Sequence, residues 1–115
     1  MDLLSEPISP DVADTAPLTR REIVDLLPEV PGWSLEDGRL VARFACKEFC
    51  DAVTFLRETV EFAKQENHFP DIGIRENRVV DVAWYTYAIG GLSMNDFIMA
   101  ARLSERLRCR QGGVL

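Results

Sequence analysis

Residues 78–103 read RVVDVAWYTYAIGGLSMNDFIMAARL, a stretch in which a strand pattern runs into a helix start. Between residues 78 and 88 the side chains alternate between two faces, as they do along a strand packed on one side. The apolar face holds Val80, Val82, Trp84 and Thr86. Ser93-x-x-Asp96 then has the spacing of a capping box, so the stretch predicts a strand followed by a helix from residue 93.

The predicted helix has an apolar face and an end rich in arginine. The apolar face consists of Phe97, Ile98, Ala101 and Leu103, and the arginines are Arg102, Arg106, Arg108 and Arg110. Cations at a helix end are stabilised by the carbonyl groups exposed there. We favour this interpretation over a site for phosphate or an acidic peptide.

The segment before residue 78 predicts one more strand and a long helix. Residues 71–75 form the strand, and Glu76-Asn77 is the turn that joins it to residues 78–88. Across residues 47–66 apolar side chains recur at helical spacing. They are Phe49, Ala52, Val53, Leu56, Val60 and Ala63, with Phe55 and Phe62 beside them. This face is expected to pack on a sheet.

A second hairpin and a short helix precede the long one. In VPGWSLEDGRLVARFAC, residues 30–46, Asp37-Gly38 separates two stretches of alternating apolar residues, which predicts a tight hairpin. Thr19 and Glu22 form another capping-box pattern, and the helix that they open is expected to end before Pro28. Zinc-type ligand sets are missing around Cys46, Cys50 and Cys109, so buried thiols and no metal are expected.

The fold class follows from this order of elements. It is α+β with the order α-β-β-α-β-β-α, an antiparallel four-stranded sheet with helices on one face. The single domain spans residues 18–110 and is followed by a flexible end at 111–115. Residues 1–17 hold three prolines and four acidic residues without a basic one, a composition that predicts a disordered acidic tail.

Charge and hydropathy narrow the classes of partner. The net charge of −6 and the pI of about 4.7 argue against nucleic acid and anionic lipid. The sequence has no apolar run of the length that a membrane span needs, and its first residues lack the features of a signal peptide. A cytoplasmic protein is expected.

His68 is the only histidine, in KQENHFPDIGI at residues 64–74. It follows the predicted end of the long helix, where it could satisfy the last carbonyl groups, or it could be the remnant of a functional site. Asp96 is expected to act as a capping residue rather than a catalytic carboxylate. Lys64 is expected to be a solvated helix position.

FAKQENHFPDIGI followed by residues 78–103 resembles the signature region of the pterin-4a-carbinolamine dehydratase family. The resemblance extends from Trp33 to Leu107 and implies the same fold. The positions that fit the family pattern are Lys64, His68, Pro70, Thr86, Gly91, Leu92, Ser93 and Asp96. Two catalytic positions depart from it, because Phe69 and Tyr87 stand where histidines are expected.

The resemblance also implies a pterin site and its chemistry. The family removes water from a 4a-hydroxytetrahydropterin, which requires a base for a ring-nitrogen proton and an acid for the leaving hydroxyl. The implied catalytic positions are His68, Tyr87 and Phe69, and the implied ligand-binding positions are Pro70, Asp71, Asn77, Thr86 and Ala88, with Asn77 replacing an aromatic. Tyrosine is a poor proton exchanger at neutral pH, and phenylalanine exchanges none. Phe69, Trp84, Tyr85 and Tyr87 could stack on a heterocycle, although such residues more often form core or interface.

Two hypotheses of function follow. The first is a family member that has lost catalysis and works by binding a protein. It is similar to a branch that is encoded with carboxysome genes and is regarded as an assembly factor for Rubisco. The second is an active dehydratase, a hydro-lyase, in which His68 and Tyr87 share the proton transfers. We favour the first, with no cofactor, an association with carboxysomes, and pairing of strand edges into a homodimer or tetramer.

Overall fold

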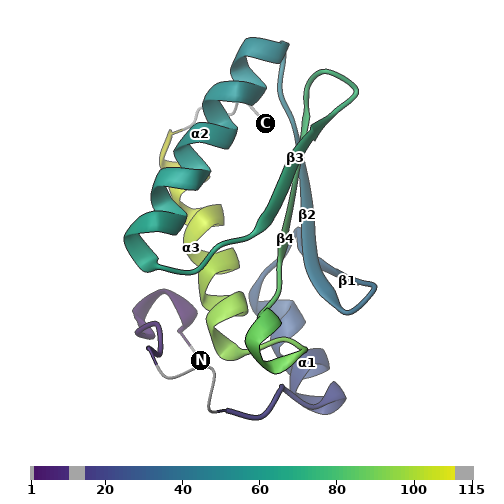
Figure 1. Cartoon of the computed structure of the whole chain (residues 1–115), viewed down its shortest axis with the longest axis vertical. Coiled ribbons are helices and arrows are strands. Elements are labelled where there is room, and N and C mark those ends of the chain that lie inside the picture. The colour runs from purple at the N-terminus through teal and green to yellow at the C-terminus, as the bar shows by residue number, and fades with distance from the viewer. Residues whose placement is uncertain (1, 11–14, 111–115) are drawn as a thin grey trace.

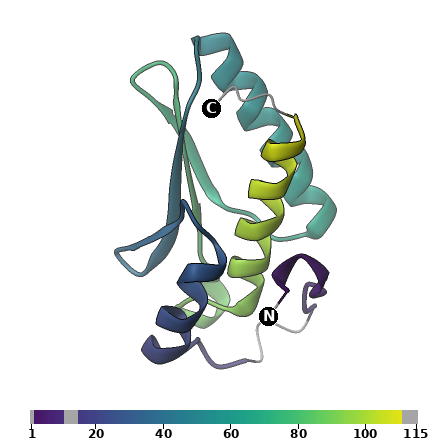
Figure 2. The ribbon, with the colours of Figure 1, turned by 180° about the vertical axis from the view of Figure 1, so that it is seen from behind.

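The structure, a computed structural model, describes residues 2–10 and 15–110, without the side chains of residues 108–110. Its larger elements are α1 (Arg20–Leu26), β1 (Ser34–Glu36), β2 (Arg39–Ala45), α2 (Phe49–Glu66), β3 (Asp71–Arg75), β4 (Val79–Trp84) and α3 (Met94–Arg110). Short 3-10 helices among these described residues are η1 (Leu3–Ser5), η3 (Leu27–Glu29) and η4 (Tyr87–Ile89). The strands form one antiparallel sheet in the order β1-β2-β4-β3, and α2 and α3 lie on one face of it (Figures 1 and 2). The predicted fold class is confirmed.

The core lies between the sheet and these two helices. Alternation places Leu40 and Ala42 of β2 beside Val80, Val82 and Trp84 of β4, and all are buried. They meet Ala52, Phe55 and Phe62 from α2 and Phe97, Ile98 and Met99 from α3. Thr86, on the same face as Trp84, is also buried, as the alternation predicts.

Tight turns close both hairpins. Asp37 and Gly38 join β1 to β2, and Glu76, Asn77 and Arg78 join β3 to β4. Two residues of each turn have positive φ, between 51° and 77°: Asp37 and Gly38, and Glu76 and Asn77. Paired left-handed residues give the turn a twist that matches that of the flanking strands. Both predicted hairpins are confirmed.

β4 ends at Trp84, although the alternation predicted a strand to residue 88. Trp84 pairs with Leu40, where β2 begins its pairing with β4, and Asp71 at the start of β3 pairs with Ala83. Beyond Trp84 no neighbouring strand remains in the described structure, so the chain turns into η4. A single bridge between Thr86 and Gly91 leads back toward α3.

The buried face of α2 is rotated from the predicted one. Ala52, Phe55, Thr59, Phe62 and Ala63 face the core, whereas Phe49 and Val53 are 55% and 38% exposed. Phe55 and Phe62 together bury more apolar surface than Val53 and Val60 on the other face would. The helix therefore presents part of its apolar surface outward.

The amino-terminal segment differs from the predicted mobile tail. Leu3 is only 4% exposed and belongs to the core, and Ile8 packs against it. The prediction rested on the charges and prolines of this segment. It did not take account of Leu3 and Ile8, the apolar side chains that bind the segment to the core. Residues 11–14 and the predicted flexible end at 111–115 lie outside the described residues.

The burial of the cysteines and the apolar character of the helices bear on two predictions from composition. Cys46 is buried as expected, but Cys50 is exposed on the outer side of α2, so the expectation of a buried thiol is wrong there. Cys109 lies outside the described side chains. None of the helices in residues 2–10 and 15–110 has both the length and the apolar character needed to cross a membrane.

Candidate functional site

A buried carboxylate lies where β4, η4 and α3 meet. Asp96, in the first turn of α3, is fully buried. Its Oδ2 accepts hydrogen bonds from the Ser93 main-chain N–H (2.9 Å) and from the Thr86 hydroxyl (2.7 Å). Asp96 thus accepts a hydrogen bond from the main chain of Ser93, the residue before the helix, as a capping-box residue does. This geometry agrees with the structural role predicted for Ser93 and Asp96.

His68 completes this network from the other side. Its Nε2 lies 2.7 Å from Oδ1 of Asp96, and its ring stacks on Trp84 with 5.8 Å between the centroids and 13° between the planes. The His68 side chain is 11% exposed. The imidazole therefore links the segment after α2 to the start of α3 through a buried hydrogen bond.

The end of α2 explains how His68 reaches this position. Asn67 is left-handed, with φ of 55°, and the main-chain N–H of His68 bonds to the Ala63 carbonyl. This Schellman arrangement satisfies the helix end with main-chain groups alone. The imidazole is free to bond Asp96 instead of the helix carbonyls. The pairing of His68 with Asp96 was not predicted from the sequence.

Tyr87 belongs to a separate cluster on the surface. Its hydroxyl donates a hydrogen bond to Oδ2 of Asp71 (2.5 Å), and its ring meets Tyr85 edge-on at 4.9 Å. The Arg39 guanidinium lies over both rings, 4.4 Å from the Tyr85 centroid and 5.3 Å from that of Tyr87. Arg39 also pairs with Asp71 at 3.9 Å. Tyr87 is therefore held by Asp71, and His68 by a different carboxylate.

This cluster makes Tyr87 a weaker acid. The hydrogen bond to Asp71, with smaller contributions from desolvation and the Asp71 charge, raises the pKa of Tyr87 above its usual value near 10. At neutral pH the phenol therefore keeps its proton. Tyr87 can donate a hydrogen bond but cannot act as a base.

The other predicted site residues are dispersed. Phe69 is 55% exposed, Pro70 is partly buried, and Ala88 is exposed in η4. Asn77 lies in the β3–β4 turn, at the opposite end of that hairpin from Asp71 (Figure 1). The structure thus joins His68, Thr86, Ser93 and Asp96 in one network and leaves Asn77 far from it.

Three hollows on the described surface do not include His68, and one of them is lined by Arg39 and Asp71 of the Tyr87 cluster. The three, of about 370, 390 and 410 Å³, are lined by the amino-terminal segment with α3, by the open face of the sheet, and by α2 with α3. His68, Phe69 and Tyr87 line none of these three. Within the described residues, no group of three or more histidine, cysteine, aspartate or glutamate side chains is arranged to hold a metal ion.

A family model described as pterin 4 alpha carbinolamine dehydratase matches residues 16–106. The chain belongs to this family. A protein of Chlorobium luteolum, provisionally named a pterin-4-alpha-carbinolamine dehydratase, is 44% identical over 93 residues, covering 77% of this chain and 81% of that protein. One from Cupriavidus pinatubonensis with the same provisional name is 38% identical and covers 90% of both chains.

A solved structure shares the fold. The crystal structure of a transcriptional coactivator/pterin dehydratase from Brucella melitensis matches with a TM-score of 0.68 and 28% identity. The match covers 77% of this chain and 96% of the other. Fold and family membership of this pterin dehydratase-like chain are therefore established together.

Proposed function

We propose that this member of the pterin-4a-carbinolamine dehydratase family has lost catalysis and works by binding a protein. The observation that carries the proposal is that His68 is the only imidazole in the chain. Phe69 and Tyr87 stand at the positions where the family pattern has histidines. General acid–base help contributes roughly 10²–10⁴-fold to a rate, so losing two of three such groups removes most of it.

The raised pKa of Tyr87 supports the same conclusion. A phenol that is protonated at neutral pH cannot take the ring-nitrogen proton of the substrate. Its hydroxyl is also bonded to Asp71, so donating a proton to a leaving group would first require breaking that bond. Tyr87 is a poor replacement for either role.

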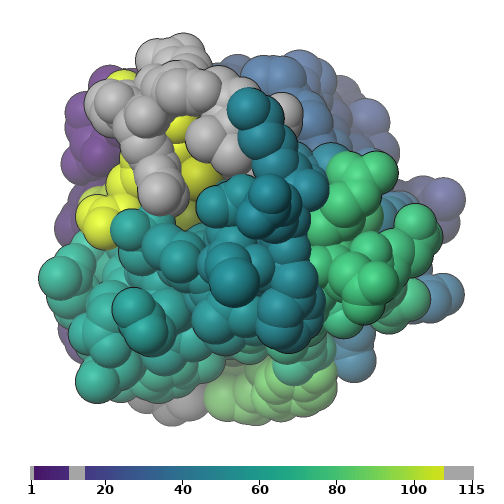
Figure 3. Space-filling model, turned by 90° about the horizontal axis from the view of Figure 1, so that it is seen from above, coloured from purple at the N-terminus to yellow at the C-terminus, as the bar shows by residue number. Residues whose placement is uncertain are grey.

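The outer side of α2 supports a protein partner. Phe49 and Val53 are exposed, and Leu56 and Val60, partly buried, continue the same line at spacings of three and four residues. Figure 3 shows α2 at the surface of the molecule with the β3–β4 hairpin beside it. We name this line of four residues the α2 stripe. Large exposed apolar patches mark protein contacts, and the α2 stripe is our candidate for such a contact.

The proposed partner is Rubisco. The substituted positions and the proline-containing amino-terminal extension resemble the family branch regarded as Rubisco assembly factors of α-carboxysomes. An assembly factor needs a rigid surface that holds a partly assembled subunit pair, and it needs no cofactor. We propose an association with carboxysomes on the same ground.

A homodimer or tetramer would present the α2 stripe more than once. β1 and β3 are the two edge strands of the sheet. β3 offers five residues of main chain, with Gly73 at its centre, to a second copy. Pairing at this edge would satisfy main-chain groups that otherwise face water.

The first experiment measures the dehydration rate of a 4a-hydroxytetrahydropterin against the uncatalysed background. We expect the wild-type chain to stay at background. The double variant Phe69→His with Tyr87→His restores both imidazoles. A gain in its dehydration rate would show that the residues that bind the pterin are otherwise intact. A wild-type rate well above background would contradict the loss of catalysis.

The second experiment tests the partner with purified α-carboxysomal Rubisco. Val53→Asp places a charge in the α2 stripe and is expected to weaken binding at least tenfold in calorimetry. Val24→Asp is the matched control, because Val24 is 56% exposed on α1, outside the stripe. Equal binding by both variants would exclude the α2 stripe as the contact surface.

One observation favours a second candidate, the active dehydratase. His68 retains a carboxylate partner at 2.7 Å, and within the described residues none of the hydrogen bonds involves its Nδ1. A histidine oriented by a buried carboxylate is a common form of general base. The dehydration assay separates the two candidates, since only this one predicts a rate that disappears with His68→Gln.

A further inference from the structure

Residues 2–10 lie outside the part of the chain that matches the family, which begins at residue 16. In the structure they lie against α3, as the purple segment of Figures 1 and 2 shows. We name them the amino-terminal strap. The strap thus precedes the part that matches the family model and covers one of the helices of that part.

The strap has a single deeply buried side chain. Leu3 is 4% exposed and joins the core beside Val30 and α3. Asp2 caps the short helix that presents it, accepting hydrogen bonds from the Leu4 N–H (3.2 Å) and the Ser5 hydroxyl (2.7 Å). The strap thus carries a leucine anchor on a locally stabilised turn.

Main-chain groups of the strap are bound as well. Asn95, only 2% exposed, accepts from the Ser9 N–H (2.9 Å) and donates to the Ser9 carbonyl (3.0 Å). Arg102 donates to the Glu6 carbonyl (2.6 Å) while its other nitrogen bonds Glu66 (2.8 Å). A side-chain amide that bonds both the N–H and the carbonyl of one residue makes the same pair of hydrogen bonds as a neighbouring strand would.

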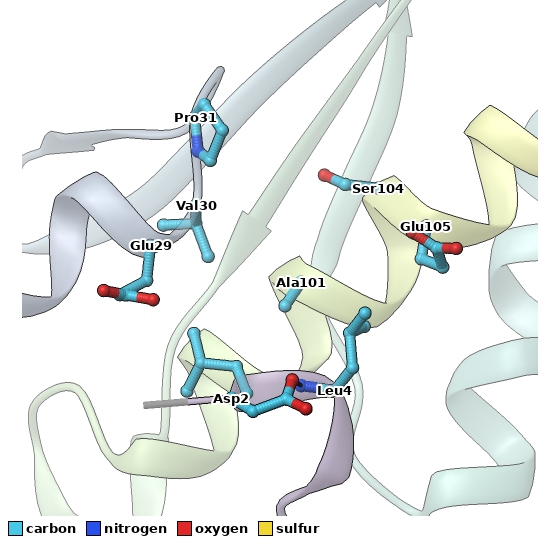
Figure 4. Close-up of a pocket in the computed structure, with 9 residues that line it drawn as sticks. Asp2, Leu4, Glu29, Val30, Pro31, Ala101, Ser104 and Glu105 are labelled. Carbon is cyan, nitrogen blue, oxygen red and sulfur yellow. Dashed lines mark hydrogen bonds between the residues drawn. The ribbon is translucent and has the colours of Figure 1, made fainter.

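The strap does not fill the space beneath it. A hollow of about 370 Å³ remains between the strap and the opposite wall, which is formed by Val30 and Pro31 with Ala101 and Ser104 of α3 (Figure 4). Asn95 and Arg102, which bind the strap, lie on α3, the helix that also lines this hollow. We name the surface of α3 under the strap, together with the wall of the hollow, the groove. This groove has an apolar end and a polar end, as peptide-binding sites do.

We propose that this groove is a peptide-binding site and that the amino-terminal strap is its ligand within the same chain. The site takes an extended peptide with a leucine at the spacing of Leu3 to Ser9, read through the main chain by Asn95 and Arg102. The strap opens reversibly and regulates access to the groove. This proposal rests on neither of the candidate functions, so its test is independent of theirs.

The covalent link decides how tightly the strap competes with a free peptide. A tethered ligand acts at an effective concentration in the millimolar range. One leucine and a few main-chain hydrogen bonds give a free peptide only weak, micromolar or poorer, binding. The closed strap should therefore reduce the apparent affinity for added peptide by roughly 10- to 100-fold.

The test uses full-length chains and a labelled peptide of residues 1–11, followed by fluorescence anisotropy. Leu3→Asp in the chain removes the anchor of the strap and leaves unchanged the side chains of α3 that bind the strap. We expect this variant to bind the peptide roughly 10- to 100-fold more tightly than the wild-type chain does. Adding Asn95→Ala to it, or replacing the leucine of the peptide by aspartate, should abolish the gain.

Equal peptide binding by the wild-type and Leu3→Asp chains would overturn the proposal, as would a gain that survives Asn95→Ala. If dilution of the wild-type chain alone opens the groove, the occupant is the strap of a second copy and the assignment within one chain is wrong. Hydrogen exchange on the wild-type chain needs no variant. We expect the Ser9 amide to exchange by local opening, faster than the core amides of α3, and exchange only through global unfolding would contradict a reversible strap.

Discussion

Asp96 and Tyr87 illustrate how one neighbour changes what a side chain can do. The Asp96 carboxylate is buried but receives hydrogen bonds from Ser93 and Thr86 and pairs with His68. A buried charge is stable only when its hydrogen bonds are made. At the surface, Asp71 holds the proton of Tyr87 in place. Each carboxylate thus holds a neighbouring side chain in a fixed hydrogen bond.

Replacing Asp96 should be costly. We expect Asp96→Ala to lower the free energy of unfolding by about 3–5 kcal/mol, because it leaves Ser93, Thr86 and His68 without their buried acceptor. Urea denaturation followed by tryptophan fluorescence measures this. Asp25→Ala is the control, since Asp25 is exposed and only pairs with Arg21 at 3.6 Å, and its loss should stay below about 0.5 kcal/mol. Similar losses for both variants would contradict the role of Asp96.

The Tyr87 proton gives a prediction about pH. Asp71→Asn removes the charged acceptor, so the pKa of Tyr87 should fall back toward about 10. Because the raised pKa favours the protonated phenol in the folded state, this contribution to stability is complete below about pH 10 and is lost as pH rises through the folded pKa. The absorbance of phenolate measures the titration. Because the chain has two tyrosines, the measurement is made in a Tyr85→Phe background, where Tyr87 is the remaining one. An unchanged titration in Asp71→Asn would refute the assigned cause.

At the scale of elements, the turns and caps follow local sequence. The Thr19 capping box and both hairpin turns form where their residues predict them. The end of β4 and the rotation of α2 were predicted wrongly because both depend on neighbours in space: the lengths of β2 and β3, and the packing of Phe55 and Phe62. Similarly, no local pattern reveals that His68 meets Asp96 or that Leu3 meets the core.

One substitution in the β3–β4 turn should increase the stability of the folded chain. Glu76 is left-handed, with φ of 54°, a conformation that asparagine tolerates better than glutamate. We expect Glu76→Asn to raise the free energy of unfolding by about 0.5–1 kcal/mol in thermal denaturation. Glu76→Ala tests the reason, because alanine gains nothing in this conformation. A gain from alanine as large as that from asparagine would mean that removing the charge, not the backbone preference, is responsible.

At the scale of the molecule, the core has a permanent part and a detachable one. Leu40 is fully buried in the sheet, whereas Leu3 reaches the core from the amino-terminal strap. We expect Leu40→Ala to cost about 3–5 kcal/mol but Leu3→Ala at most about 2 kcal/mol, because an open strap limits what its anchor can lose. Equilibrium urea denaturation compares the two. Equal losses would show that the strap is an integral part of the cooperative unit.

The pairing of β2 with β4 also shapes how the chain reaches its fold. Ala45 pairs with Val79, so this contact closes a loop that contains all of α2 and β3. The two hairpins and α2 can form locally within microseconds, but long loop closure costs chain entropy and slows the central pairing. Until β4 has been synthesised and can pair with β2, a growing chain exposes the apolar face of its first hairpin. During synthesis, that interval is when contact with other nascent chains competes with folding.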